Sequence, residues 1–196
     1  MTENRLIDLL DEIGALDRNS LELFHPRVRD RDDVAVLRCT SSEVIVLSTI
    51  DHVLGTTYYE DRAEDEGICC RSERLVTPRL PDNVRRAQQF AHLVTGKRWL
   101  DFGCGLGGLL DELAKDSAHA VGIEANRERA AIVAAKGYSV ALGLSEVSRV
   151  SFDVATLCHV LEHLPEPLSI LRELKERLRP GGRLVIEVPH ARDVLI

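Results

Sequence analysis

The chain has 196 residues, of which 44% are hydrophobic and 29% are charged, and its formal net charge is −7 at pH 7. These values are typical of a soluble globular protein with one domain, or with one domain and a small appendage, and they leave no room for two large domains. No apolar run reaches the roughly 18 residues of a membrane span, and the acidic balance argues against nucleic acid as a partner.

The N-terminus and the cysteines predict a cytoplasmic protein with free thiols. The first eleven residues are charged throughout and lack the apolar core and cleavage site of a secretory signal. Five cysteines are an odd number without the spacing of a disulfide framework. Cys69 and Cys70 are adjacent, without the usual spacer between zinc ligands or a second ligand pair nearby, so no metal site is predicted.

Residues 1–83 are predicted to form an N-terminal α+β appendage, or cap, on a core domain of residues 84–196. Glu3 to Ile13 has the pattern of an amphipathic helix. Val34 to Cys39 and Val44 to Leu47 flank a polar turn and predict a β-hairpin. Val84 to Val94 is predicted to be a helix that leads into the core domain.

Beyond residue 96, short apolar runs alternate with helical patterns. The predicted strands are Arg98 to Phe102, Ala120 to Ile123, Tyr138 to Leu142, Asp153 to Cys158 and Arg183 to Val188. The predicted helices are Gly107 to Lys115, Arg127 to Lys136 and Glu166 to Leu178, and Pro180-Gly181-Gly182 is predicted to turn the chain after the last of them. Five strands separated by helices or loops indicate an α/β fold with a Rossmann-like, doubly wound, mostly parallel sheet.

A glycine-rich turn follows the first predicted strand of this sheet. Gly103, Gly105 and Gly107 carry no Cβ, so the backbone N–H groups of the turn can approach a bound ligand closely. Together with Gly108, the turn also satisfies G-x-G-x-x-G, which leaves an NAD(P)-dependent oxidoreductase as an alternative. Glu124 ends the second strand, where a carboxylate accepts hydrogen bonds from the ribose hydroxyls of either kind of cofactor.

Three ordered stretches resemble the motifs of class I S-adenosylmethionine-dependent methyltransferases, in the branch that acts on small molecules and glycans. They are Leu100 to Gly107, Phe152 to Pro167 and Leu178 to Pro189, and the resemblance covers Arg98 to His190. It implies S-adenosylmethionine as cofactor, S-adenosylhomocysteine as product and a small-molecule or sugar acceptor. In this family an acid at the position of Asp101 organises the loop and meets the methionine part of the cofactor, whose ammonium group favours a carboxylate.

The resemblance also gives a candidate site at the carboxyl ends of the strands. His159 is expected beside the methyl group, where an imidazole can deprotonate an acceptor hydroxyl, and Glu162 and His163 are the other candidate catalytic residues. The alternative is that His159 only lines the pocket. The expected cofactor-binding residues are Asp101, Phe102, Gly103, Cys104, Gly105, Gly107, Glu124, Ala125, Ser145, His159 and Val160. Arg85 and Arg86 are expected either to meet the carboxylate of the cofactor or to lie on an exposed helix face.

The complete fold of this family has two further strands after the fifth, whereas this sequence stops at Ile196. The fifth strand would then have an exposed apolar edge. Truncation, substitute strands from Val34 to Leu47, and a homodimer that pairs along the edge are three competing explanations, of which we favour truncation. A shortened chain adds a non-enzymatic alternative, a cofactor-binding but inactive or regulatory fragment. Tyr58 and Tyr59 lie in a region loosely similar to methyltransferases of sugar synthesis, and they are expected either to close the active site or to pack the cap on the core.

Overall fold

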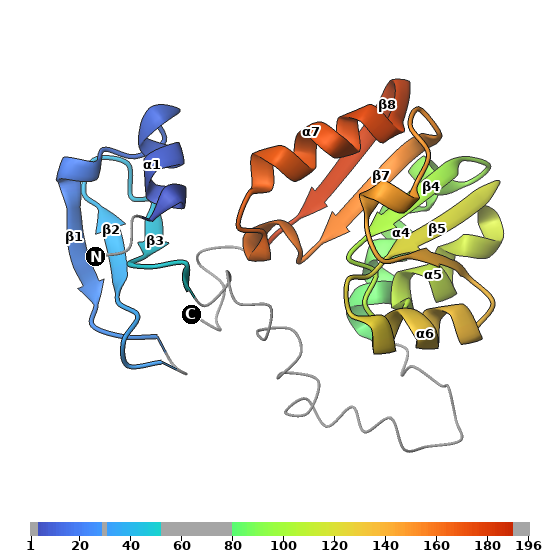
Figure 1. Cartoon of the computed structure of the whole chain (residues 1–196), viewed down its shortest axis with the longest axis horizontal. Coiled ribbons are helices and arrows are strands. Elements are labelled where there is room, and N and C mark those ends of the chain that lie inside the picture. The colour runs from blue at the N-terminus through green and yellow to red at the C-terminus, as the bar shows by residue number, and fades with distance from the viewer. Residues whose placement is uncertain (1–3, 29–30, 52–79, 190–196) are drawn as a thin grey trace. The chain divides into compact units, whose positions relative to one another are not determined.

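The structure, a computed structural model, describes residues 4–28, 31–51 and 80–189. The described residues form two compact units, one within residues 4–51 and one within residues 80–189 (Figure 1). Tyr58, Tyr59, Cys69 and Cys70 lie outside the described residues, so what we expect of them stays a prediction. The predicted domain boundary after residue 83 also stays a prediction.

The first unit is a small antiparallel sheet with one α-helix. Its elements are α1 (Arg5–Glu12), the 3-10 helix η1 (Arg18–Ser20), β1 (Leu21–His25), β2 (Val36–Cys39) and β3 (Ile45–Leu47), with the strands in the order β1-β2-β3. The Asn4 side chain begins α1 by accepting hydrogen bonds from the N–H groups of Leu6 and Ile7. The predicted hairpin is confirmed as β2 and β3, but β1 was not predicted. Within this sheet β2 pairs with both β1 and β3, and the role of these strands as substitute strands for the second unit stays a prediction.

The second unit is built on a five-stranded parallel sheet in the order β6-β5-β4-β7-β8 (Figure 1). The strands are β4 (Arg98–Phe102), β5 (His119–Ile123), β6 (Ser139–Ala141), β7 (Phe152–Cys158) and β8 (Leu178–Glu187). The strand order reverses between β4 and β7, where Asp101 pairs with Thr156. The predicted Rossmann-like fold is confirmed, and this reversal is where open α/β sheets bind their ligands.

Helices cover both faces of this sheet. They are α4 (Pro81–Val94), α5 (Gly108–Leu113), α6 (Arg127–Ala135) and α7 (Pro167–Arg177), with the 3-10 helices η2 (Ala114–Asp116), η3 (Leu144–Glu146) and η4 (Leu161–His163). Trp99 of β4 packs with α4 and α5, whereas its neighbour Leu100 packs with Leu174 of α7 on the opposite face. This alternation makes β4 the buried centre of the unit. Within the described part of the chain, no helix is both long and apolar enough to cross a membrane.

The start of β8 corrects the sequence-based prediction. We expected Pro180-Gly181-Gly182 to form a turn before a strand that begins at Arg183, but the strand begins at Leu178. Its pairing with β7 shifts register between Leu178 and Arg183, and Gly181 has a left-handed φ of 78°. The glycines therefore form an irregularity within the strand, as a β-bulge does.

Candidate functional site

The loop between β4 and α5 has a backbone that requires glycine. Gly103, Gly105 and Gly107 have φ angles of 76°, 57° and 78°, in the left-handed region that other residues rarely adopt. A Cβ atom at Gly103 would lie only 2.3 Å from Cγ2 of Val160. Val160 and the loop, both expected to bind cofactor, are therefore in contact, and a side chain at residue 103 would force them apart.

Glu124 holds the glycine loop in place from the end of β5. Its Oε2 accepts a hydrogen bond from the N–H of Gly105 at 3.0 Å, and its Oε1 accepts one from the N–H of Asn126 at 2.8 Å. Ala125, another expected cofactor residue, lies between Glu124 and Asn126 in the sequence. Since a carboxylate offers about four acceptor positions, Glu124 can still accept hydrogen bonds from ligand hydroxyls.

Asp101 is a buried carboxylate at the end of β4, with 4% of its surface exposed. Its Oδ1 accepts a hydrogen bond of 2.6 Å from the hydroxyl of Thr156, which also accepts one of 2.9 Å from the indole N–H of Trp99. Burial raises the pKa of Asp101 to about 6, although the Thr156 hydrogen bond and the nearby Arg86 guanidinium oppose the rise. A buried carboxylate of this kind is suited to a cationic ligand group.

A cavity of about 290 Å³ opens beside Asp101. Residues of β4, the glycine loop, α4, α5, α6 and β7 line it: Leu80, Asn83, Arg86, Asp101, Gly103, Cys104, Leu106, Gly108, Leu109, Arg129 and Cys158. The other expected cofactor residues, Phe102, Gly105, Gly107, Glu124, Ala125, Ser145, His159 and Val160, are not in this lining. Phe102 packs instead in the core on the face that α7 covers. The cavity therefore accounts for one part of the expected site, and its Asp101 and Arg86 suit a ligand group that carries both an ammonium and a carboxylate.

The two cysteines of the cavity are neutral thiols. Burial raises the pKa of Cys104, and it raises the pKa of Cys158 to about 12. The Asp101 carboxylate acts on both thiols in the same direction. Because the thiolate is the nucleophile, neither side chain is suited to covalent chemistry at this site.

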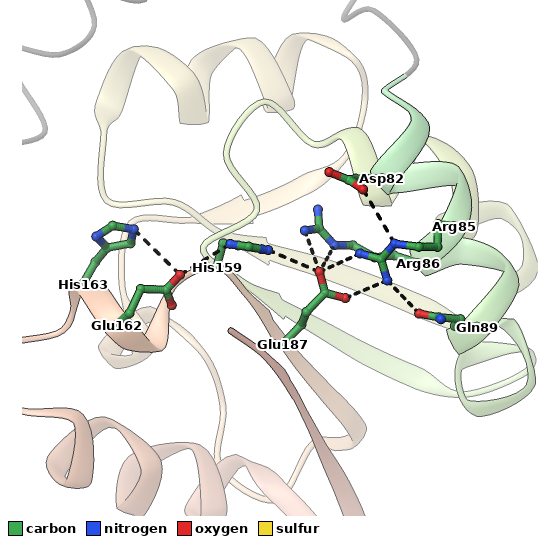
Figure 2. A network of polar contacts seen from close by, with 8 residues as sticks. All are labelled: Asp82, Arg85, Arg86, Gln89, His159, Glu162, His163 and Glu187. Carbon is green, nitrogen blue, oxygen red and sulfur yellow. Dashed lines mark hydrogen bonds and ion pairs between the residues drawn. The ribbon is translucent and has the colours of Figure 1, made fainter. Parts of the chain in front are cut away.

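Glu187, the last residue of β8, links the end of this strand to helix α4 (Figure 2). Its Oε1 accepts hydrogen bonds of 2.8 Å from both Arg85 and Arg86, and its Oε2 accepts a second one from Arg85 at 3.1 Å. Burial alone would raise the pKa of Glu187, but these hydrogen bonds outweigh it and lower the pKa to about 2. Both arginines thus bind a carboxylate of their own chain, a contact that was not expected. Arg85 lies on an exposed face of α4, as one of the two expectations had it, and Arg86 lines the cavity.

His159 lies between two carboxylates directly after β7 (Figure 2). Its Nε2 is 3.3 Å from Oε1 of Glu187, and its Nδ1 is 3.5 Å from Oε1 of Glu162. Its backbone has a left-handed φ of 55°, an uncommon conformation outside glycine that often marks a functional position. His163 lies at the far side of Glu162, 4.0 Å from the same oxygen. The three candidate catalytic residues are therefore together, and the imidazole of His159 remains 44% exposed.

The loop after β6 is fixed from two sides. Glu146 accepts a hydrogen bond from the N–H of Leu142 at 3.1 Å, and the buried Arg177 of α7 donates one of 2.8 Å to the carbonyl of Leu144. Ser145, an expected cofactor residue, lies exposed between Leu144 and Glu146. Arg177 therefore supports this part of the site from α7, whose Leu174 packs in the same core cluster as Leu144.

Sequence reasoning missed four residues that shape the site: Trp99, Thr156, Asn83 and Glu187. Thr156 and Glu187 are polar residues next to apolar runs of their strands, a signal that could have found them. In the sequence, Trp99 looks like an ordinary core residue. Its indole N–H becomes important only because Thr156 lies opposite it in the fold. Asn83 carried no signal, since its place in the cavity depends on where α4 packs.

Comparisons with known proteins agree with these motifs. The profile of the methyltransferase domain family matches residues 73–195. The ubiquinone biosynthesis O-methyltransferase of Aeromonas salmonicida is 34% identical over an alignment of 101 residues, and the match covers 46% of this chain and 42% of that protein. The enzyme of the same name from Paraburkholderia phymatum is 35% identical over 114 residues, or 52% and 48% of the two chains. The chain thus spans less than half the length of these relatives.

A solved structure supports the fold. The SAM dependent methyltransferase from Archaeoglobus fulgidus superposes with a TM-score of 0.53, and the match covers 70% of this chain and 61% of that one. The two sequences are 21% identical over this match. At that level of identity, the likeness speaks for the fold alone.

Proposed function

The chain belongs to the methyltransferase domain family, and we propose that it transfers a methyl group from S-adenosylmethionine to a hydroxyl oxygen of a small-molecule acceptor. The observation that carries this proposal is the buried carboxylate of Asp101, which shares a cavity with the Arg86 guanidinium below the glycine loop. Oxygen as the methylated atom is supported by the relatives, which are named O-methyltransferases. Sugar hydroxyls are the second acceptor class that we would test.

The residues present fit the methyl donor, which supplies an electrophilic methyl group on a sulfonium when bound. Asp101 and Arg86 complement the ammonium and carboxylate of its amino-acid part, and Glu124 accepts hydrogen bonds from ribose hydroxyls. A dinucleotide would instead bring a pyrophosphate to the loop beside Asp101, where like charges repel. This repulsion disfavours the oxidoreductase alternative.

Within this proposal, His159 is the general base. A neutral imidazole that donates its Nε2–H to Glu187 keeps a lone pair on Nδ1, which then takes the proton of the acceptor hydroxyl. Glu162, 3.5 Å from Nδ1, stabilises the imidazolium that results. Chemistry of this kind also needs the acceptor oxygen held in line with the methyl carbon, which is a matter of positioning.

Two measurements test the proposed function. Calorimetry with S-adenosylmethionine, S-adenosylhomocysteine and NADH should give binding of the first two ligands, and a preference for NADH would contradict the proposal. Transfer of a radiolabelled methyl group should then be measured across phenols, sugars and carboxylic acids, with hydroxyl acceptors expected to react. Binding of S-adenosylhomocysteine without turnover on any acceptor would instead support the non-enzymatic alternative of a cofactor-binding protein.

A further inference from the structure

Three buried polar groups form a continuous hydrogen-bonded chain beneath the cavity. Trp99 and Thr156 have no exposed surface, and Asp101 has 4%. The indole Nε1 lies 2.9 Å from Oγ1 of Thr156, which in turn lies 2.6 Å from Oδ1 of Asp101. These hydrogen bonds connect two neighbouring strands, β4 and β7, at the point where the strand order reverses.

The direction of these hydrogen bonds follows from which groups can donate. An indole N–H is only a donor, so Trp99 donates to the hydroxyl of Thr156. The single hydroxyl hydrogen is then directed to an acceptor, and Oδ1 of Asp101 at 2.6 Å is much closer than the carbonyl of Leu100 at 3.4 Å. Thr156 therefore donates to Asp101, and Trp99 orients the hydroxyl that does so.

The same hydrogen bond acts on the charge of Asp101. The ionisable groups that face Asp101 are Arg86 from α4, Cys104 from the glycine loop and Cys158 from β7. Both thiols are neutral because burial raises their pKa values, so Arg86 is the charged group among them. Burial raises the pKa of Asp101, whereas the Thr156 hydroxyl and Arg86 lower it. Loss of the hydroxyl would therefore shift Asp101 toward its protonated form.

We propose that Thr156, oriented by Trp99, is a positioning residue for methyl-donor binding: its hydroxyl occupies Oδ1 of Asp101, so that Oδ2 is left for the ammonium of the donor. Among the residues that the structure describes, Oδ2 has no hydrogen-bond partner. The proposal rests on the proposed function, because it assumes that S-adenosylmethionine is the ligand of this cavity. Thr156 thus controls the affinity for the donor, although it does not line the cavity itself.

The test compares Thr156→Val with Thr156→Ser as a matched control, using calorimetry between pH 6 and pH 8.5. The probes are S-adenosylhomocysteine and 5′-methylthioadenosine, which lacks the amino-acid part. At pH 7, Thr156→Val should weaken S-adenosylhomocysteine binding by about tenfold to a hundredfold, the loss expected for a hydrogen bond to a charged group. The affinity should recover toward pH 8.5, as Asp101 ionises again, and Thr156→Ser should bind nearly as the parent protein does. Binding of 5′-methylthioadenosine should be unchanged in both variants.

A second variant separates this role from a general loss of structure. Thr156→Val leaves the indole N–H buried without an acceptor, whereas Trp99→Phe combined with Thr156→Val removes both polar partners. Relative to Trp99→Phe alone, the double variant should lose less stability than Thr156→Val loses relative to the parent protein, but it should still lose S-adenosylhomocysteine affinity. Unchanged S-adenosylhomocysteine binding in Thr156→Val, or an equal loss of 5′-methylthioadenosine binding, would overturn this inference alone. A parent protein that binds neither probe would overturn the proposed function and this inference with it.

Discussion

The Nε2 atom of His159 lies 3.3 Å from Oε1 of Glu187, and the same oxygen accepts hydrogen bonds from Arg85 and Arg86 of α4 (Figure 2). One carboxylate thus contacts both the proposed base and a wall of the proposed donor cavity, because Arg86 lines that cavity. Changes at Glu187 are therefore expected to affect protein stability and the orientation of His159 together. The first prediction addresses the stability that Glu187 contributes, and the second addresses the role of His159.

Replacement of Glu187 by Gln should destabilise the protein at neutral pH. The folded state lowers the pKa of Glu187 from 4.5 to about 2, so its ionised form contributes stability above pH 4.5 that is lost as the pH falls toward 2. We expect a loss of roughly 1–2 kcal/mol in the free energy of unfolding at pH 7, shrinking below pH 4.5. Denaturant titrations at several pH values measure it. Asp82→Asn, which removes the exposed partner 3.6 Å from Arg85, is the control and should change stability by less than about 0.5 kcal/mol. A pH-independent loss in Glu187→Gln would contradict the prediction.

Replacement of His159 by Ala should lower turnover but leave donor binding intact. A positioned general base contributes about 10²-fold to 10⁴-fold, so kcat should fall within that range once an acceptor is known. Because His159 is proposed to act on the acceptor hydroxyl and not on the donor, the affinity for S-adenosylhomocysteine should stay within about twofold. His92→Gln, at an exposed position of α4, serves as the control for kcat. Turnover that survives His159→Ala would instead favour the alternative in which His159 only lines the pocket.

Replacement of Glu124 by Ala should weaken every adenosine-containing ligand alike. The change removes the acceptors that hold the N–H groups of Gly105 and Asn126 and that we assign to ribose hydroxyls. S-adenosylhomocysteine and 5′-methylthioadenosine should both lose about tenfold or more in affinity, as measured by calorimetry. This pattern differs from that expected for changes near Asp101, which spare the smaller ligand. If only S-adenosylhomocysteine were affected, Glu124 would not be the ribose acceptor.

The sequence predicted best where a local pattern decides the structure. The strand Arg98–Phe102 was predicted with its observed bounds, because a short apolar run meets a glycine turn that few other structures accommodate. Strand β1 was missed because its apolar residues Leu23 and Phe24 are 64% and 52% exposed, so Leu21–His25 has no buried face to give a pattern. The start of β8 was wrong because Pro180 and two glycines, which usually mark a turn, here form an irregularity inside a strand.

The polar contacts of the site could not be predicted from sequence. Arg85 and Glu187 lie 102 positions apart, and only the parallel packing of β7 and β8 beside α4 brings them together. The expectation for Arg85 and Arg86 considered a ligand or solvent as their partner, and the carboxylate of their own chain was not weighed. By contrast, the sequence pointed to Asp101 and Glu124. One lies at the end of the strand before the glycine loop and the other at the end of the next strand, and a local sequence pattern defines both positions.

Replacement of Asp101 by Asn should stabilise the protein while abolishing donor binding. Burial raises the pKa of Asp101 from 3.8 to about 6, so the folded state favours the protonated acid, and this contribution to stability is lost as the pH rises through 6. Above pH 6 the ionised, buried side chain carries a cost that Asn does not, and the free energy of unfolding at pH 7.5 should increase by roughly 1–3 kcal/mol. The gain should vanish as the pH falls toward 4, where both side chains are neutral. Thermal melts at these pH values measure the effect, and calorimetry should show that S-adenosylhomocysteine binding is lost while 5′-methylthioadenosine still binds. Equal stability of the two proteins at pH 7.5 would contradict the argument that the site keeps a costly charge for the sake of its ligand.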